Sequence, residues 1–232
     1  MLESICADLA DLADDDRAIQ VARFFQTGPG QYAEGDIFWG IPNPEVRKVA
    51  RRWEHLDFGE VENLLRDPVH ECRFVALLIW VRQYPKASAV AQQAIFESYL
   101  AHLDYINNWD LVDLSARDIV GRHLFDQDRG VLYALARRPH LWSQRVALIA
   151  TFYFIRKNQF ADSLALAQIL LPHEHHLIHK AIGWMLREIG KRDLDVMEEF
   201  IHRHILRLPR TSLRYAIEHL SPFRRQYYLA LR

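Results

Sequence analysis

Glu71-Cys72-Arg73-Phe74-Val75-Ala76-Leu77-Leu78 in the first half of the chain is echoed by Ser143-Gln144-Arg145-Val146-Ala147-Leu148-Ile149 in the second. Each stretch places one arginine before an apolar run, and the two arginines are 72 residues apart, twice a period of 36. The apolar positions recur with helical spacing, so both stretches predict buried helices. An imperfect repeat of this length is typical of helix pairs that stack along one direction.

Helical periodicity covers almost the whole chain, and no stretch alternates as a strand would. We expect helices at about residues 2–13, 18–25, 44–53, 58–66, 69–83, 87–103, 108–122, 128–137, 141–156, 160–170, 174–189, 193–206, 210–220 and 222–231. Proline-containing breakers separate many of them, and Asn43 with Pro44 reads as a helix cap and first turn. We therefore predict an all-α fold, a right-handed α-solenoid of HEAT-like repeats with a concave basic groove. Residues 1–232 would form a single domain.

The net charge of −1 hides a strong asymmetry between the two halves. Residues 1–116 carry 10 Lys and Arg against 19 Asp and Glu, whereas residues 117–232 carry 19 against 11. Only five of the 29 basic residues are lysines. Arginine binds phosphate through paired hydrogen bonds and stacks on aromatic rings, so the second half is suited to nucleic acid. A GC-rich genome would explain the arginine bias equally well.

The sequence also indicates the compartment. Cys6 and Cys72 both lie in apolar helical patterns, so we expect reduced core residues and not a disulfide framework. Residues 1–16 are acidic and lack the basic start of a signal peptide. The apolar run at 146–155 is too short to span a bilayer. We expect a cytoplasmic protein with no membrane partner.

The candidate site consists of Trp109, Asp113, Arg145 and Trp184. Trp109 and Asp113 are four residues apart, which places both on one helix face. Arg145 follows Trp109 by 36 residues and Trp184 follows Arg145 by 39, close to the repeat length. The four side chains would then line one side of the array. Two aromatics, a carboxylate and a guanidinium suit a planar cation on a phosphate backbone, which points to alkylated DNA.

Each of these residues also has a structural interpretation. Trp109 can be a core anchor, because a buried indole needs only one acceptor. Asp113, in an apolar helix, must be solvated or paired, and a salt bridge to Arg145 or Arg117 would staple adjacent repeats. Gly183 narrows the helix before Trp184 and lets another segment approach closely.

Three segments resemble the signature segments of the AlkD-type DNA alkylation repair proteins, which are HEAT-like-repeat DNA glycosylases. They are Asn108-Trp109-Asp110-Leu111-Val112-Asp113, Trp142-Ser143-Gln144-Arg145-Val146-Ala147 and Lys180-Ala181-Ile182-Gly183-Trp184-Met185-Leu186-Arg187-Glu188. Their order and spacing match over about residues 20–220. Three motifs in the right order are a far more specific signal than any one of them.

The resemblance implies hydrolysis of the N-glycosidic bond of positively charged N3- and N7-alkylated purines, without a metal or organic cofactor. It implies that Asp113 is the catalytic carboxylate. Trp109 and Trp184 would pack against the deoxyribose and backbone of the damaged nucleotide, and Arg145 would grip the DNA backbone. The expected partner is double-stranded DNA with alkylated purines, bound by a monomer in the cytoplasm.

Two other functions fit the same fold. One is a non-catalytic protein that binds damaged or branched DNA through the same groove. The other is a HEAT-type scaffold for protein partners, which the charge asymmetry and the aromatic–carboxylate set disfavour.

Two further motifs are weaker. The segment Thr27-Gly28-Pro29-Gly30-Gln31-Tyr32-Ala33-Glu34-Gly35-Asp36 lacks the Gly-Lys-Ser/Thr of a P-loop. We read it as a connecting loop; the alternative is a groove-rim loop whose amides meet phosphate. The segment His173-Glu174-His175-His176-Leu177-Ile178-His179 is not His-Glu-x-x-His, and we read it as a solvated helix start rather than a metal site.

Overall fold

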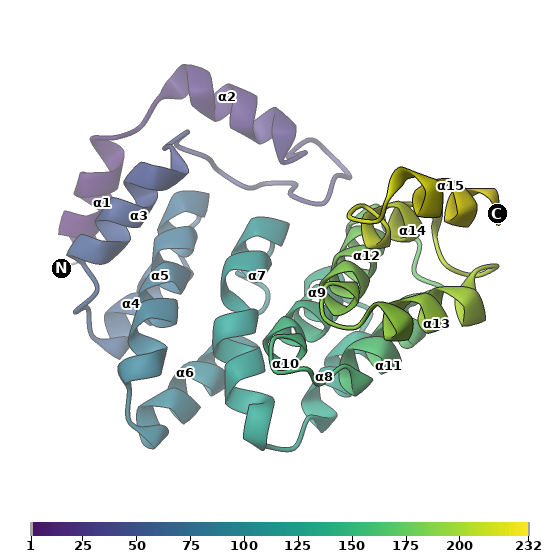
Figure 1. Cartoon of the computed structure of the whole chain (residues 1–232). Coiled ribbons are helices and arrows are strands. Elements are labelled where there is room, and N and C mark those ends of the chain that lie inside the picture. Colours follow the sequence, from purple (N-terminus) through teal and green to yellow (C-terminus); the bar gives the residue numbers. More distant parts are fainter. Residues whose placement is uncertain (1, 232) are drawn as a thin grey trace. The chain divides into compact units, whose positions relative to one another are not determined.

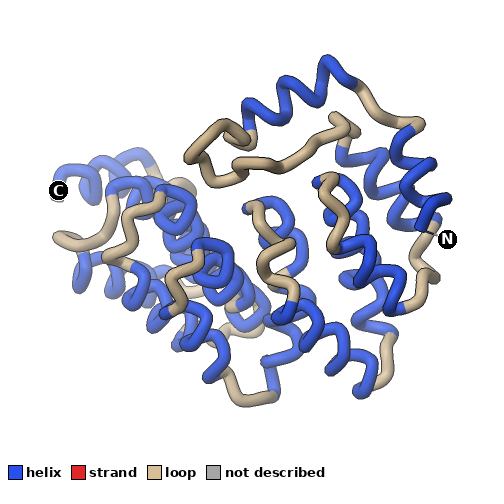
Figure 2. Tube along the Cα trace, turned by 180° about the vertical axis from the view of Figure 1, so that it is seen from behind, coloured by secondary structure: helices blue, strands red, loops and turns tan. Residues whose placement is uncertain are grey.

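The computed structural model describes residues 2–231, and its regular elements are helices joined by loops (Figure 1, Figure 2). Within that range the exception is an isolated parallel bridge between Ile37 and Val69. The predicted all-α fold of helical repeats is confirmed. The chain divides into two compact units, one ending at Ser115 and one beginning at Ala116. The single domain over residues 1–232, the handedness and the basic groove belong to the chain as a whole and stay predictions.

The first unit is built around α5 (His70–Gln83), whose residues from His70 to Trp80 are all buried. Helices α3, α4 and α7 pack against α5, and α1 contacts both α3 and α5. The elements of this unit are α1 (Leu2–Ala10), α2 (Asp15–Phe24), α3 (Asn43–Arg52), α4 (Phe58–Leu65), α5, η1 (Tyr84–Lys86), α6 (Ala89–Ala101) and α7 (Trp109–Ser115).

Side-chain caps start several of these helices. Asp14, Asp57 and Ser88 each accept a hydrogen bond from a backbone N–H in the first turn of the helix that follows. Such a cap contributes about 1 kcal/mol because it satisfies an amide that has no partner within the helix. At α3 the expectation was wrong by one residue, since the helix begins at Asn43 and Pro42 occupies the cap position.

The second unit centres on α12 (His176–Gly190), which packs against α9, α13 and α14. The other elements of this unit are η2 (Arg117–Gly121), η3 (Leu124–Asp126), α8 (Gly130–Arg137), α9 (Leu141–Ala150), α10 (Phe152–Ile155), α11 (Ala161–Leu170), α13 (Leu194–His204), α14 (Arg210–Ala216) and α15 (Pro222–Ala230).

Two helices predicted as continuous are interrupted. The helix expected at 108–122 ends at Ser115 and is followed by the π-helical turn η2. The helix expected at 141–156 breaks at Thr151 between α9 and α10. Ser115 and Thr151 each donate their hydroxyl to a carbonyl of the preceding turn. This local bond competes with the regular helix pattern and commonly bends it.

Gly183 allows a close helix contact, as its position before Trp184 predicted. A Cβ atom at Gly183 would lie 2.5 Å from the carbonyl oxygen of Ser212 and 2.5 Å from Cβ of Tyr215. Helix α12 therefore meets α14 with almost no space between their backbones at this point.

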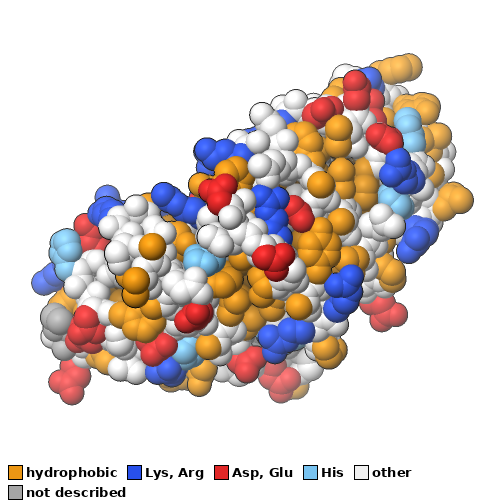
Figure 3. Space-filling model, turned by 90° about the horizontal axis from the view of Figure 1, so that it is seen from below, with side chains coloured by type: hydrophobic (Ala, Val, Ile, Leu, Met, Phe, Trp, Pro, Cys, Tyr) orange, Lys and Arg blue, Asp and Glu red, His pale blue; other side chains and the backbone are white. Residues whose placement is uncertain are grey.

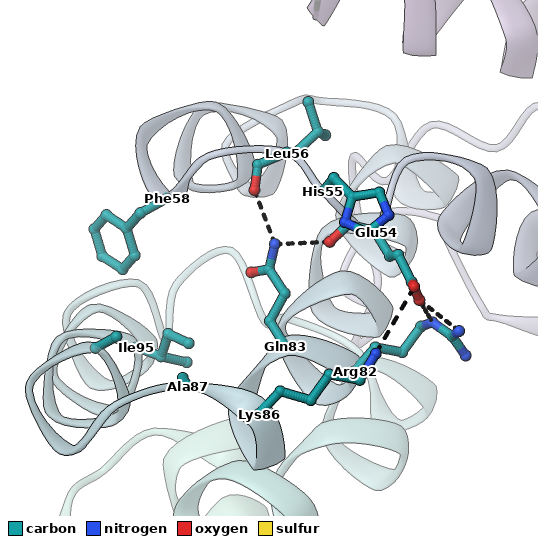
Figure 4. Close-up of a pocket in the computed structure, with 10 residues that line it drawn as sticks. Glu54, His55, Leu56, Phe58, Arg82, Gln83, Lys86, Ala87 and Ile95 are labelled. Carbon is teal, nitrogen blue, oxygen red and sulfur yellow. Dashed lines mark hydrogen bonds and ion pairs between the residues drawn. The ribbon is translucent and has the colours of Figure 1, made fainter.

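A cavity of about 390 Å³ lies between the α3–α4 connection and helices α5 and α6 (Figure 4). The Gln83 amide donates to the carbonyls of Glu54 and Leu56, at 3.0 and 2.8 Å. Arg82 Nε donates to the Glu54 carboxylate at 2.6 Å. These polar groups bind one another and hold the α3–α4 turn on α5, so the cavity has a structural explanation.

The two cysteines are both free, but only Cys72 is fully buried. Cys6 is half-exposed, so the prediction of two core cysteines is wrong for this residue. None of the described helices combines the length and the hydrophobicity needed to cross a membrane.

Candidate functional site

The segment before α7 is held by its own polar side chains. Asn108 Oδ1 accepts from the backbone N–H of Trp109, and Asp110 Oδ1 accepts from that of Leu111, both at 2.8 Å. The side-chain amides of Asn107 and Asn108 each donate to the Asp36 carboxylate at 3.2 Å. The start of α7 is thus tied to the loop that follows α2.

Asp36 is the centre of a buried ionic network. Its side chain is only 3% exposed, and it also pairs with the Arg73 guanidinium and with His70 Nδ1. Burial alone would raise the pKa of the Asp36 carboxyl, but the hydrogen bond from His70 and the charge of Arg73 hold this pKa below its usual value. Asp36 is therefore an ionised carboxylate that joins α5 to the start of α7.

His70 bridges Asp36 and Asp110, with its Nε2 at 2.8 Å from Asp110. Burial disfavours the charged ring, yet the charge and hydrogen bond of Asp110 and then those of Asp36 raise the pKa of His70 to about 9. The ring is an imidazolium at neutral pH, and both nitrogens donate.

The sequence analysis missed Asp36, His70, Arg73 and Asp110. The signal that could have found them is the charged start of α5, where His70, Glu71 and Arg73 precede an unbroken apolar run at 74–81. Such groups need buried partners, and the polar residues before α7 supply them.

Four rings stack in sequence beside this network. The order is His70, Phe38, Phe25 and Trp109, with successive centroids 4.4, 5.0 and 5.2 Å apart and planes within 27°. Phe24 contacts Trp109 with its edge at 6.1 Å. Trp109 is therefore both half-buried and fixed in orientation by rings from α2 and the loop after it.

A cavity of about 550 Å³ opens next to this stack, between α2, α3, α5 and α7. Trp109, Asp110 and Asp113 all line it, so the structure brings Trp109 and Asp113 to one surface as their spacing predicted. Phe24, which is 67% exposed, and Arg17 also line it. Aromatic faces and carboxylates favour a planar cation, and an exposed arginine favours a phosphate.

The glycine-rich loop uses its amides within the protein. The N–H groups of Gly28 and Gly30 are bound by the side chains of Gln31 and Glu34, each at 2.8 Å. Further along, the Glu71 carboxylate accepts from the N–H groups at positions 39, 40 and 41. These contacts support the connecting-loop interpretation, because the backbone N–H groups that could bind a phosphate already donate hydrogen bonds to side chains of the protein.

Arg145 and Trp184 belong to the second unit. Arg145 is 4% exposed and donates from Nη1 to the carbonyl of Leu177 at 2.6 Å. Trp184 is half-exposed, and its ring meets the Phe152 ring edge to face at 5.6 Å. The alignment of these two residues with Trp109 and Asp113 stays a prediction.

The histidines of residues 173–179 form the start of α12. His175 is the cap residue and its Nδ1 accepts from the N–H of Leu177 at 3.2 Å. Burial first, and then His176, His173, His179 and Arg145, lower the pKa of His175 to about 4. The ring is neutral, as an acceptor must be. This capping contact agrees with the predicted helix start.

Charge is mixed on the face drawn in Figure 3, where basic, acidic and apolar side chains alternate without one large area of either sign. The charge difference between the halves of the chain is therefore not visible as a single patch on this face.

The fold and the cavity define an all-helical repeat protein with an aromatic and acidic site. A family model described as DNA alkylation repair enzyme matches residues 5–220, so the chain belongs to that family. The resemblance inferred from the sequence is confirmed, and the protein is an enzyme of DNA alkylation repair with DNA as its partner.

A solved structure shares this fold. It is described as a predicted DNA alkylation repair enzyme from Enterococcus faecalis and is 18% identical in sequence, with a TM-score of 0.70. The match covers 90% of this chain and 97% of that chain. No curated protein matches the sequence significantly.

Proposed function

We propose that the protein is a DNA glycosylase that hydrolyses the N-glycosidic bond of positively charged N3- and N7-alkylated purines in duplex DNA. The observation that carries this proposal is the cavity of the first unit, where Asp113 and Trp109 lie together beside aromatic rings. The proposal also rests on the family, because removal of an alkylated base is one way to repair alkylated DNA and the side chains of this cavity suit that reaction.

The chemistry needs no strong acid. An alkylated purine already carries a positive charge, so it leaves as a neutral base when the pair of electrons of the C1′–N bond moves onto the ring. A water oxygen forms the new bond to C1′, and one proton is released. The Asp113 carboxylate would stabilise the positive charge that develops on the sugar and would orient this water.

Trp109 has a supporting role in this proposal. Its ring would pack against the deoxyribose of the damaged nucleotide, since an aromatic face attracts both cations and polarised C–H groups. Trp184 would pack in the corresponding way from the second unit. Arg145 is 4% exposed, so it would hold the backbone only if its guanidinium left the Leu177 carbonyl. Phosphate binding of this kind carries most of the affinity but no sequence information.

The test is release of free base from methylated duplex DNA. We expect the wild-type protein to release 7-methylguanine or 3-methyladenine, and Asp113→Asn to lower the rate by about 10²-fold or more. DNA binding by Asp113→Asn should change only a few-fold. The matched control is Asp11→Asn, an exposed carboxylate of the same unit, which should release base at the wild-type rate.

Two results would contradict parts of this proposal. Equal release by wild type and Asp113→Asn would remove Asp113 from the chemistry. Salt-sensitive DNA binding by the wild type without release of any alkylated base would leave a non-catalytic DNA-binding protein instead.

A further inference from the structure

Three potential metal ligands lie close together in space, and all three are distant in sequence from the candidate site residues Trp109 and Asp113. Cys6 lies in α1, Asp67 in the α4–α5 turn and Cys72 in the first turn of α5. One ligand atom from each, the two sulfurs and a carboxylate oxygen, lie within 4.8 Å of one another. Both thiols are free, so nothing covalent holds them together. The packing of α1 on α5 brings the three groups into one place.

Asp67 is the unusual member of this cluster. Its Oδ1 accepts from the backbone N–H of Val69 at 2.8 Å, and it is half-buried. Its neighbours in the cluster are the thiols of Cys6 and Cys72, and the Cys72 thiol is hydrogen-bonded to this carboxylate. A half-buried carboxylate is costly without a compensating charge, so the cluster attracts a cation.

The geometry of this cluster suits a divalent cation. The Asp67 carboxylate attracts the cation and serves as its third ligand beside the two sulfurs.

We propose that Cys6, Asp67 and Cys72 bind one thiophilic divalent metal ion, with zinc as the best fit. Zinc binds sulfur at about 2.3 Å and carboxylate oxygen at about 2.0–2.2 Å, which sets tetrahedral ligand atoms roughly 3.5–3.8 Å apart. The ligand atoms lie within 4.8 Å of one another, so binding would require them to approach by about 1 Å. Water would complete the fourth position.

The balance of the binding step is simple. Two metal–sulfur bonds and one metal–oxygen bond form, two thiol protons pass to the solvent, and no electron is transferred. The bound ion would clamp α1 onto the first turn of α5. That turn also carries His70 and Arg73, so the metal would stabilise the end of α5 that supports α7.

Zinc titration of the chelator-washed full chain tests the proposal. We expect one Zn²⁺ per chain, protection of the half-exposed Cys6 thiol from a maleimide reagent, and a higher thermal unfolding midpoint. Co²⁺ in place of Zn²⁺ should produce a thiolate-to-metal charge-transfer absorption. A Cys6 thiol that remains fully reactive in the presence of saturating Zn²⁺ would overturn the proposal.

Two variants address the ligands separately. Cys6→Ser changes a half-exposed residue and Asp67→Asn keeps the shape of the side chain, so both chains should fold. Each should bind Zn²⁺ at least about tenfold more weakly, in line with the removal of one ligand. Asp11→Asn is the control and should bind as the wild type does. Wild-type affinity in both ligand variants would sink the assignment, whatever the glycosylase assay shows.

Discussion

The two units of this protein differ in how they use charge. The first unit carries the excess of acidic residues and the second the excess of basic residues. The charges were counted up to residue 116 and the first unit ends at Ser115, but Ala116 is uncharged, so the counts hold for the units as well. The cavity with Asp113 lies in the acidic unit, and Arg145 lies in the basic one. Under the proposed glycosylase function, the first unit would stabilise positive charge on the damaged nucleotide and the second would attract phosphate, which is a division of work between the units.

The units also differ in how they hold their buried polar groups. In the first, the Asp36 carboxylate forms ion pairs with both Arg73 and a charged His70. In the second, Arg145 binds a backbone carbonyl and His175 acts as a neutral acceptor. An ionic network fixes geometry strongly, but it fails as a whole when one member is removed.

Asp36→Ala should have the largest effect on stability. It would leave the buried cations of Arg73 and His70 without their shared partner, at a cost of about 3–5 kcal/mol in the free energy of unfolding. Urea unfolding measures this change, with Asp11→Ala as an exposed control that should alter stability by less than about 0.5 kcal/mol. A decrease below about 1 kcal/mol for Asp36→Ala would mean that the network does not organise the first unit.

Alkaline pH should have the second-largest effect, a decrease in the stability of the first unit. The pKa of His70 is raised to about 9 in the folded chain, from an ordinary value of 6.5. The stability that it contributes is fully present below about pH 6.5 and is lost as the pH rises through 9, by about 3 kcal/mol at most. Unfolding measured at pH 6 and pH 9.5 in the presence of a chelator should show this decrease in the wild type but not in His70→Gln.

Neutralising exposed basic residues of the second unit should weaken DNA binding by about tenfold in moderate salt. Arg156 and Lys157 are adjacent and exposed there. The double change to Gln should lower the slope of log K against log salt by up to about 1.8, or about 0.9 for each phosphate that the protein no longer neutralises. The control is the double variant Arg51→Gln with Lys86→Gln in the first unit. If both double variants weaken DNA binding equally, the two units do not differ in how they attract phosphate.

Acidic pH should have the smallest effect, a slight decrease in the stability of the second unit. The pKa of His175 is lowered to about 4, so its contribution is present above about pH 6.5 and is lost as the pH falls towards 4. Because this side chain is partly exposed, the change should stay under about 1 kcal/mol. His175→Asn keeps a capping acceptor that does not titrate in this range, so thermal unfolding at pH 5 and pH 7 should differ less in this variant.

Helix positions could be predicted well because their causes are local. Residues 58–66 and 69–83 were expected as helices, and the structure has α4 and α5 almost there. The breaks at Ser115 and Thr151 were missed, since neither residue interrupts the apolar pattern. Each break depends on one side-chain hydroxyl that binds the preceding turn, and an apolar period does not contain that information.

The site could be predicted only in part. Trp109 and Asp113 share a helix face because four residues make about one turn, and this held without knowledge of the fold. Asp36 could not be found in the same way, because its partners Asn107 and Asn108 follow 71 and 72 residues later. Phe25 likewise reaches Trp109 only when α2 and the loop after it are in place.

The sequence by itself determined the helical class, most helix boundaries, the charge difference between the halves and the family to which the chain belongs. These properties depend on neighbours within one or two turns or on composition. Only the tertiary structure decided that His70 is charged and that the Phe25 ring stacks on Trp109. It alone also brings the thiols of Cys6 and Cys72 close to the Asp67 carboxylate. Ion pairing, ligand geometry and ring stacking depend on distances between groups far apart in the chain, which packing alone sets.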